Sequence, residues 1–187
     1  IINDNSARAM ELETGGIDLT DSLNIADVTR FKENPNIEAY TVPSTKVVYM
    51  AFNESHPILS NEKVRLAIAH AIDAQSVCKM AYGDGAILAT SSMPSTLYGY
   101  KNVGLHEYDV DLAKQLLAEA GYADGFSFNT VCPSVAASIK TAEAVKAFLA
   151  AVNIDMTIEH YDAATSRGTN LRDGSAESAP YNLTADT

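Results

Sequence analysis

Residues 57–73 read PILSNEKVRLAIAHAID, and this stretch decides how the surrounding chain folds. After the opening proline, Ser60 or Asn61 can cap a helix, because a short side-chain oxygen accepts a hydrogen bond from an unpaired backbone N–H group. The apolar residues that follow have the i, i+3, i+4, i+7, i+8 spacing of one helix face: Val64, Ala67, Ile68, Ala71 and Ile72. Because an apolar run precedes the proline, the sequence predicts a strand, a turn and an amphipathic helix.

The composition is that of a soluble globular protein with an acidic surface. The chain has 187 residues, 47% of them hydrophobic, which is long enough for one good core. It carries 13 basic and 24 acidic residues, a net charge of −11, and such a surface repels phosphate backbones and anionic lipids. No apolar run approaches the roughly 18 residues of a membrane-spanning helix. We therefore expect neither nucleic-acid binding nor direct membrane insertion.

The two ends of the sequence give a further expectation about the parent protein. The chain begins with Ile1-Ile2, shows no secretion signal, and stops part-way through an expected strand. We interpret it as a fragment of a longer protein.

Helical and strand patterns alternate along the chain. Helices are expected at 5–13, 26–32, from the 57–73 stretch on to 82, at 109–120, 138–152 and, more weakly, 163–172; strands are expected at 17–19, 37–42, 46–52, 126–131, 154–160 and 181–185. Residues 46–52 are apolar on both faces, which is typical of a central strand. The alternation predicts the α/β class, with a mixed sheet covered by helices. Residues 83–108 lack a period, and a loop of this length is usually functional or packs over a neighbour.

The sequence gives no argument for catalysis, a cofactor or a metal site. Gly83-Asp84-Gly85 resembles half of a phosphate-binding loop but follows a helix, so we interpret it as a turn. The serines lack a recognisable nucleophile context, and the four histidines share no ligand-like spacing. Cys78 and Cys132 are the only cysteines, and their distance, hence any pairing, stays open from sequence alone. We expect a protein that is not an enzyme.

Three stretches share their order and spacing with one family of transport proteins. They are YMAFN at 49–53 followed by residues 57–73, residues 108–126, and GGIDL at 15–19 followed by Ala26-Asp27. In these stretches the chain resembles the family 5 extracellular solute-binding proteins, the peptide- and nickel-binding subunits of ABC importers. The resemblance covers about residues 6 to 160.

The resemblance implies a fold and a mechanism. Family members have two lobes of the type II periplasmic-binding-protein-like fold, and residues 1–187 would form a single ligand-binding lobe, mainly the carboxy-terminal one. Ligand bridges the lobes, hinge closure buries it, and a membrane permease recognises the closed form. The implied location is the periplasm or the extracellular face of the cytoplasmic membrane, where a lipoprotein anchor would hold the full-length protein.

The resemblance also directs attention to candidate ligand-binding residues. Peptide-binding members pair an Asp, located just beyond the strand matching 181–185, with the peptide amino terminus, and often an Arg with its carboxylate. The Arg lies in the loop after the strand matching 126–131, and the corresponding loop here, 132–137, is short and uncharged. The candidate ligand-binding residues are therefore Cys132, Pro133, Ser134, Val135 and Asn53.

The implied function is capture of a solute, with an oligopeptide as the expected cargo, for import through an ABC permease. One alternative from a different class stays open. The same lobe, fused to a DNA-binding domain, would serve as the ligand-sensing domain of a transcription regulator.

Overall fold

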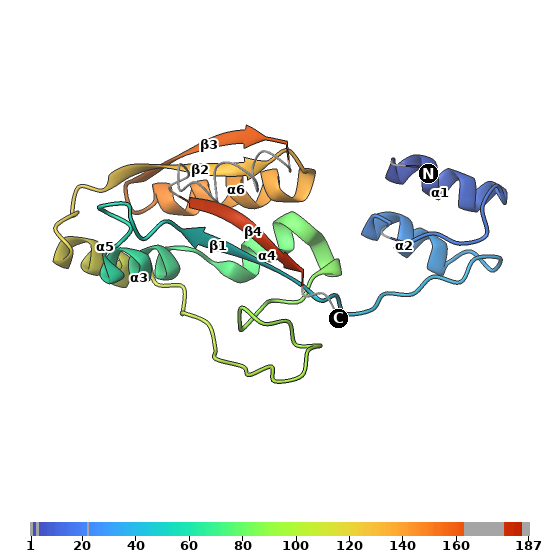
Figure 1. Cartoon of the computed structure of the whole chain (residues 1–187), viewed down its shortest axis with the longest axis horizontal. Coiled ribbons are helices and arrows are strands. Elements are labelled where there is room, and N and C mark those ends of the chain that lie inside the picture. Colours follow the sequence, from blue (N-terminus) through green and yellow to red (C-terminus); the bar gives the residue numbers. More distant parts are fainter. Residues whose placement is uncertain (1, 3, 22, 163–177, 185–187) are drawn as a thin grey trace.

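The computed structural model of the chain describes residues 2, 4–21, 23–162 and 178–184 (Figure 1). In chain order the elements are α1 (Asn5–Thr14), α2 (Ile25–Lys32), β1 (Lys46–Phe52), α3 (Glu62–Ala71), α4 (Ala74–Tyr82), the 3-10 turn η1 (Gly83–Gly85), α5 (Val110–Glu119), β2 (Phe126–Pro133), α6 (Ala136–Ala150), β3 (Ile154–Tyr161) and β4 (Ser178–Thr184). The α/β class expected from the sequence is confirmed.

Helix α3 forms where the opening stretch predicted it. Asn61 is the N-cap, and its side-chain oxygen accepts from the backbone N–H of Lys63. The predicted apolar stripe faces inward: Val64, Ala67, Ile68 and Ala71 are buried. The expectation of a continuous helix to residue 82 is wrong, because the backbone becomes extended at Ile72 and Asp73 caps a second helix, α4.

The cap of α4 also changes the acidity of its carboxyl group. The Asp73 side chain accepts from the backbone N–H groups of Gln75 and Ser76, and from the Ser76 hydroxyl. These hydrogen bonds, led by that of the Ser76 hydroxyl, hold the pKa of Asp73 below its ordinary value.

The four strands form a mixed sheet in the order β1-β4-β2-β3. Strands β2 and β3 are parallel, β2 and β4 are parallel, and β1 runs antiparallel to β4. The prediction of a mixed sheet is confirmed. The prediction that residues 46–52 form a central strand is wrong for the sheet of the described residues, because β1 lies at its edge. Met50 and Phe52 of this strand pack against the core, and residues 47–49 lie beside the long loop that follows η1.

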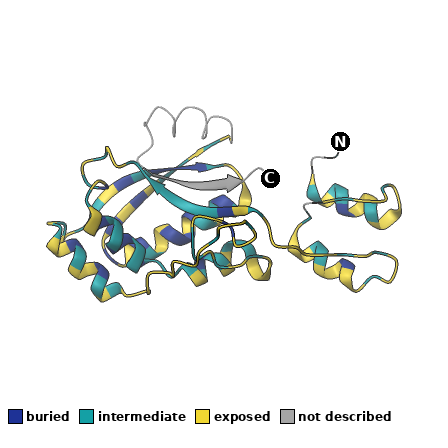
Figure 2. Ribbon diagram, turned by 60° about the horizontal axis from the view of Figure 1, so that its bottom comes forward, coloured by how far each residue is buried: buried dark blue, intermediate teal, exposed yellow. Residues whose placement is uncertain are grey.

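Helices α3 to α6 and one face of the sheet enclose the core (Figures 1 and 2). The sheet contributes Phe128 and Met156, and the helices contribute residues such as Ile68, Leu117 and Leu149. Helix α5 lies where the sequence predicted a helix, and the side chain of Asp109, its N-cap, accepts from the backbone N–H of Leu112. The core therefore depends on the periodic segments that the sequence identified.

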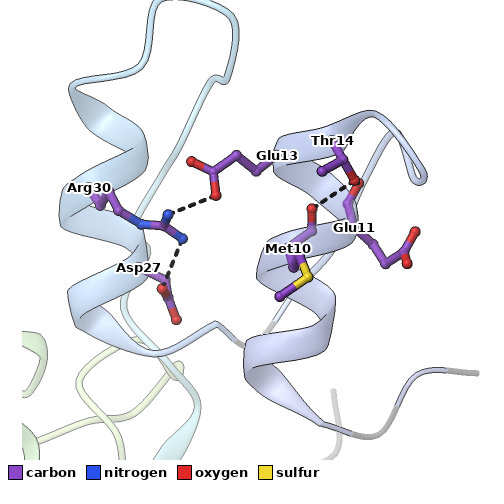
Figure 3. Close-up of polar contacts among 6 residues, drawn as sticks. All are labelled: Met10, Glu11, Glu13, Thr14, Asp27 and Arg30. Carbon is purple, nitrogen blue, oxygen red and sulfur yellow. Dashed lines mark hydrogen bonds and ion pairs between the residues drawn. The ribbon is translucent and has the colours of Figure 1, made fainter.

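Helices α1 and α2 lie outside this core and contact each other (Figures 1 and 3), and α2 also touches η1, where the Ile25 side chain lies beside Gly85. The Arg30 guanidinium forms ion pairs with Glu13 at 2.7 Å and with Asp27 at 3.3 Å. Helix α1 buries Ala9, whereas Met10 is 64% exposed.

Two short strands expected near the amino terminus are wrong. Residues 17–19 and 37–42 have no strand structure, and Leu19, Tyr40 and Val42 are largely exposed. An apolar pattern gives a strand only where a partner strand completes the hydrogen bonding, and neither segment has such a partner among the described residues. The helix expected at 163–172 lies outside the described residues, as does the last residue of the strand expected at 181–185.

Candidate functional site

The parallel strands β2 and β3 end together at one edge of the sheet. Pro133 and Tyr161, their last residues, are register partners, and the chain then turns through Ser134 and Val135 into α6. We call these four residues the carboxyl edge. In open α/β sheets, ligands bind outside the carboxyl ends of the strands. The carboxyl edge is therefore the candidate binding site of this sheet.

Backbone hydrogen bonds fix the shape of the carboxyl edge. The Ser134 N–H donates to the Tyr161 carbonyl at 2.8 Å, and the Val135 N–H donates to the Pro133 carbonyl at 2.7 Å. Val135 is the N-cap of α6, has extended backbone angles and offers no side-chain cap. The first turn of a helix has N–H groups without intrahelical partners and a partial positive charge. An uncharged, half-exposed Val135 beside them suits a ligand group that accepts hydrogen bonds.

Two of the predicted ligand-binding residues lie in β2 and not in a loop. Cys132 and Pro133 extend the strand beyond residue 131, and residues 136 and 137 already belong to α6, so the loop expected at 132–137 is wrong at both ends and contains only Ser134 and Val135. Strand pairing with β3 continues through both of them, which explains the extension.

The Cys132 side chain points into the core and has no exposed surface. Burial, with a further contribution from the charge of Glu143, raises the pKa of the Cys132 thiol to about 11. The thiol is therefore protonated at neutral pH, and the ligand-binding role predicted for it does not fit this structure. The pairing left open by the sequence is absent, since Cys78 and Cys132 are both free thiols.

Asn53 is not brought to the carboxyl edge. Phe52 is level with Ser178, which is level with Thr130 of β2, so Asn53 lies about five residues, or roughly 16 Å along the strands, from Ser134. The Asn53 side chain accepts from the Ser55 N–H at 2.9 Å and shapes the turn that leads to α3. Its placement indicates a structural role in this turn.

An open cavity of about 270 Å³ lies beside β1, lined by residues 47–49, 89–92 and 103–105. The register places Tyr49 opposite Tyr181, and counting from the Thr130–Ser178 pair brings Pro133 level with the same row. The cavity and the carboxyl edge therefore lie toward the same end of the sheet. Sequence reasoning did not assign the cavity, although it singled out the irregular region 83–108 that supplies most of its wall.

The wall of the cavity is apolar with a few hydroxyl groups. Thr90 Oγ1 lies 2.6 Å from the Tyr100 hydroxyl, and the Val103 N–H donates to the Thr90 carbonyl at 3.1 Å. These bonds hold the two passes of the loop together. Such a wall can bind an apolar or hydroxyl-bearing group.

Among the described residues, no three His, Cys, Asp or Glu side chains are placed to hold a metal ion. None of the helices in this part of the chain has the length and apolar character needed to cross a membrane.

Comparison with known proteins places these observations in a family. The family model of the bacterial extracellular solute-binding proteins, family 5 Middle, matches residues 1–187. The chain is 34% identical over 127 residues to heme-binding protein A of Haemophilus influenzae, covering 67% of this chain and 23% of that protein. It is 32% identical over 130 residues to the dipeptide-binding protein of Escherichia coli, covering 69% of this chain and 24% of that protein.

A solved structure agrees over almost the whole chain. The periplasmic binding protein DppA from Helicobacter pylori, in complex with the peptide STSA, superposes with a TM-score of 0.85 at 32% identity, covering 99% of this chain and 36% of that one. The chain thus spans about a quarter of the length of the curated relatives above. From the full-length family match, the relatives and the shared fold, we conclude that this chain belongs to the family 5 bacterial extracellular solute-binding proteins.

Proposed function

We propose that residues 1–187 form a ligand-binding lobe of the solute receptor of an ABC importer, with an oligopeptide as the cargo. The observation that carries this proposal is the likeness to two proteins named for peptide binding. The chain is 32% identical in sequence to the dipeptide-binding protein of Escherichia coli and 32% identical to Helicobacter pylori DppA, on which it also superposes with a TM-score of 0.85. The regulator alternative gains no support from these relatives.

The carboxyl edge supports a peptide as the ligand. A peptide presents carbonyl oxygens and a carboxylate, which accept hydrogen bonds from backbone N–H groups such as those at the start of α6. Val135 is 52% exposed and places an apolar side chain beside these donors. The cavity beside β1 supplies a second, largely apolar surface for a side chain of the ligand.

The proposed mechanism is capture without chemical change. A ligand held between this lobe and the rest of the parent protein stabilises the closed state by its differential affinity for that state. The closed form is then the species that docks on the membrane permease, outside the cytoplasmic membrane. Because the lobe supplies only part of the contacts, we expect the isolated 187-residue chain to bind peptides weakly or not at all.

The experiment that tests this function uses the full-length parent protein. Its bound solute would be identified by mass spectrometry after purification from its own cells, and affinities for peptides would be measured by isothermal titration calorimetry. We expect peptides in the first measurement. We also expect the substitution Val135→Asp to weaken peptide binding at least tenfold, because it places a negative charge beside the donors of α6.

The matched control is Ala147→Asp, which adds the same charge on an exposed position near the other end of α6. Its affinity should equal that of the unsubstituted protein. A non-peptide solute would refute the peptide assignment. Equal affinities for the Val135→Asp variant and the control would remove the carboxyl edge from the binding site.

A further inference from the structure

A pair of histidines lies where α3 ends and the long loop returns to the body. His70 is the penultimate residue of α3, and His106 lies in the loop just before α5. Their ring centres are 5.3 Å apart, and the ring planes meet at 68°. Neither residue belongs to the carboxyl edge or lines the cavity beside β1, so the pair is independent of the proposed function.

The hydrogen bonds around His70 determine which ring nitrogen is available. His70 Nδ1 lies 2.7 Å from the Glu107 carbonyl oxygen. A carbonyl oxygen only accepts, so Nδ1 carries the hydrogen and donates, and in the neutral ring Nε2 keeps its lone pair. A backbone carbonyl in this position is the arrangement that orients metal-binding histidines and fixes their tautomer.

The separation of the two rings fits coordination of one ion. Zinc–nitrogen bonds of about 2.0–2.1 Å at tetrahedral angles place the centres of two imidazole rings roughly 5 Å apart. The second ring is on the solvent side, because His106 is exposed while His70 is half-buried. An ion could therefore reach the pair without rearrangement of the core.

The backbone holds the two histidines in place. The Asp109 N–H donates to the His70 carbonyl at 2.8 Å, so the residues on both sides of Tyr108 are tied to the end of α3. The Tyr108 ring also packs edge-on against Phe148, with ring centres 5.6 Å apart. The short segment carrying His106 is thus anchored at several points.

We infer that His70 and His106 form a binding site for a divalent transition-metal ion of the zinc class, with water in the remaining coordination positions. Imidazole nitrogen is a ligand suited to zinc, copper and nickel, whereas magnesium and calcium prefer oxygen. A bound ion would fasten the loop to α3 and would stabilise the folded chain through its binding free energy.

The experiment titrates the 187-residue chain with Zn²⁺ against a colorimetric chelator, with Mg²⁺ as the cation that should not bind. We expect one Zn²⁺ per chain. His106→Ala should weaken binding at least tenfold, because it removes an exposed ligand without touching the core. His70→Asn should do the same, because an asparagine amide can still donate to the Glu107 carbonyl but offers no nitrogen in place of Nε2.

The control is His160→Ala, which removes another exposed histidine, located on β3, and should bind Zn²⁺ like the original chain. Circular dichroism would establish that each variant is folded. Absence of saturable Zn²⁺ binding would overturn the inference. Undiminished binding in the His106→Ala or the His70→Asn variant would also overturn it, since the ion would then not lie between the two rings.

Discussion

The body formed by the sheet and α3 to α6 and the pair formed by α1 and α2 reach their structures by different means. In the body, Leu59, Leu117 and Leu149 are at most 1% exposed, and all of them belong to one continuous core. The helices of the pair bury one residue each, Ala9 and Phe31. Figure 2 shows the same contrast in the distribution of buried and exposed residues.

Polar contacts at the surface hold the pair together. The Arg30–Glu13 ion pair is 49% and 43% exposed at its two side chains, and an exposed pair of this kind contributes little because water and salt screen it. The Arg30 guanidinium also lies 4.7 Å from the centre of the Phe31 ring. Segments with few buried contacts open locally at a low free-energy cost. The stability of the chain is therefore concentrated in the body.

The largest expected effect breaks the body itself. Ala67 has no exposed surface and faces the core from α3. We expect Ala67→Asp to lower the free energy of unfolding by about 4 kcal/mol or more, because it buries a carboxyl group without a partner. Urea unfolding followed by circular dichroism would measure the change.

The control for this substitution is Ala147→Asp, on the exposed side of α6, where the cost should stay within about 0.5 kcal/mol. Similar losses in the two variants would mean that the buried face of α3 does not carry the stability assigned to it.

A smaller effect is expected from the close backbone approach between the residues that directly precede β2 and β3. Gly125 has φ +83°, and a Cβ atom there would lie 1.8 Å from the Asn153 carbonyl oxygen. We expect Gly125→Ala to cost about 3 kcal/mol in unfolding free energy, since left-handed strain and backbone displacement add. The midpoint of urea unfolding would reveal it.

Gly121 provides a matched comparison in the same connection. It has φ +88°, but a Cβ atom would meet nothing within 4 Å. Gly121→Ala should therefore cost only the conformational strain, about 1–2 kcal/mol. Equal losses of unfolding free energy at Gly121 and Gly125 would show that the backbone near Asn153 moves aside at no cost, contrary to the tight approach described for Gly125.

The smallest effect on the body is expected from a change in the pair. Phe31 is 1% exposed. Phe31→Ala should abolish amide protection in α1 and α2 while leaving the unfolding free energy of the body unchanged within about 0.5 kcal/mol, because distant sites act independently. Hydrogen exchange read by mass spectrometry would separate the two regions. Loss of protection in α3 or β1 would show that the two regions unfold together.

Local signals in the sequence predicted local structure correctly. The cap at Asn61, the apolar stripe of α3 and the helix expected at 109–120 each depend on residues within a few positions of one another, and all three are present. The failures concern partners distant in sequence. Residues 37–42 alternate like a strand but have no strand beside them, and the edge position of β1 depends on pairing with β4, more than a hundred residues later.

The same limit applies to the candidate site. The sequence directed attention to Ser134 and Val135, which do lie at the carboxyl ends of parallel strands. It also grouped Asn53 and Cys132 with these two residues. The strand register shows that Asn53 lies away from the carboxyl edge, and the direction of its side chain shows that Cys132 faces the core. Burial of Cys132 follows from its position in β2 opposite His160, a pairing that no local pattern specifies.

The sheet ends at β1, and the irregular loop of residues 83–108 lies beside this edge strand. The edge strand β1, KVVYMAF, has a single charged residue, and an exposed apolar edge of this kind can add strands from another molecule. The loop lies along residues 47–49 without forming a strand. A regular strand in the place of the loop would pair with β1, but it would itself become an edge strand with unpaired backbone N–H and C=O groups. Because the irregular loop offers no continuous row of backbone N–H and C=O groups, it does not continue the sheet beyond β1.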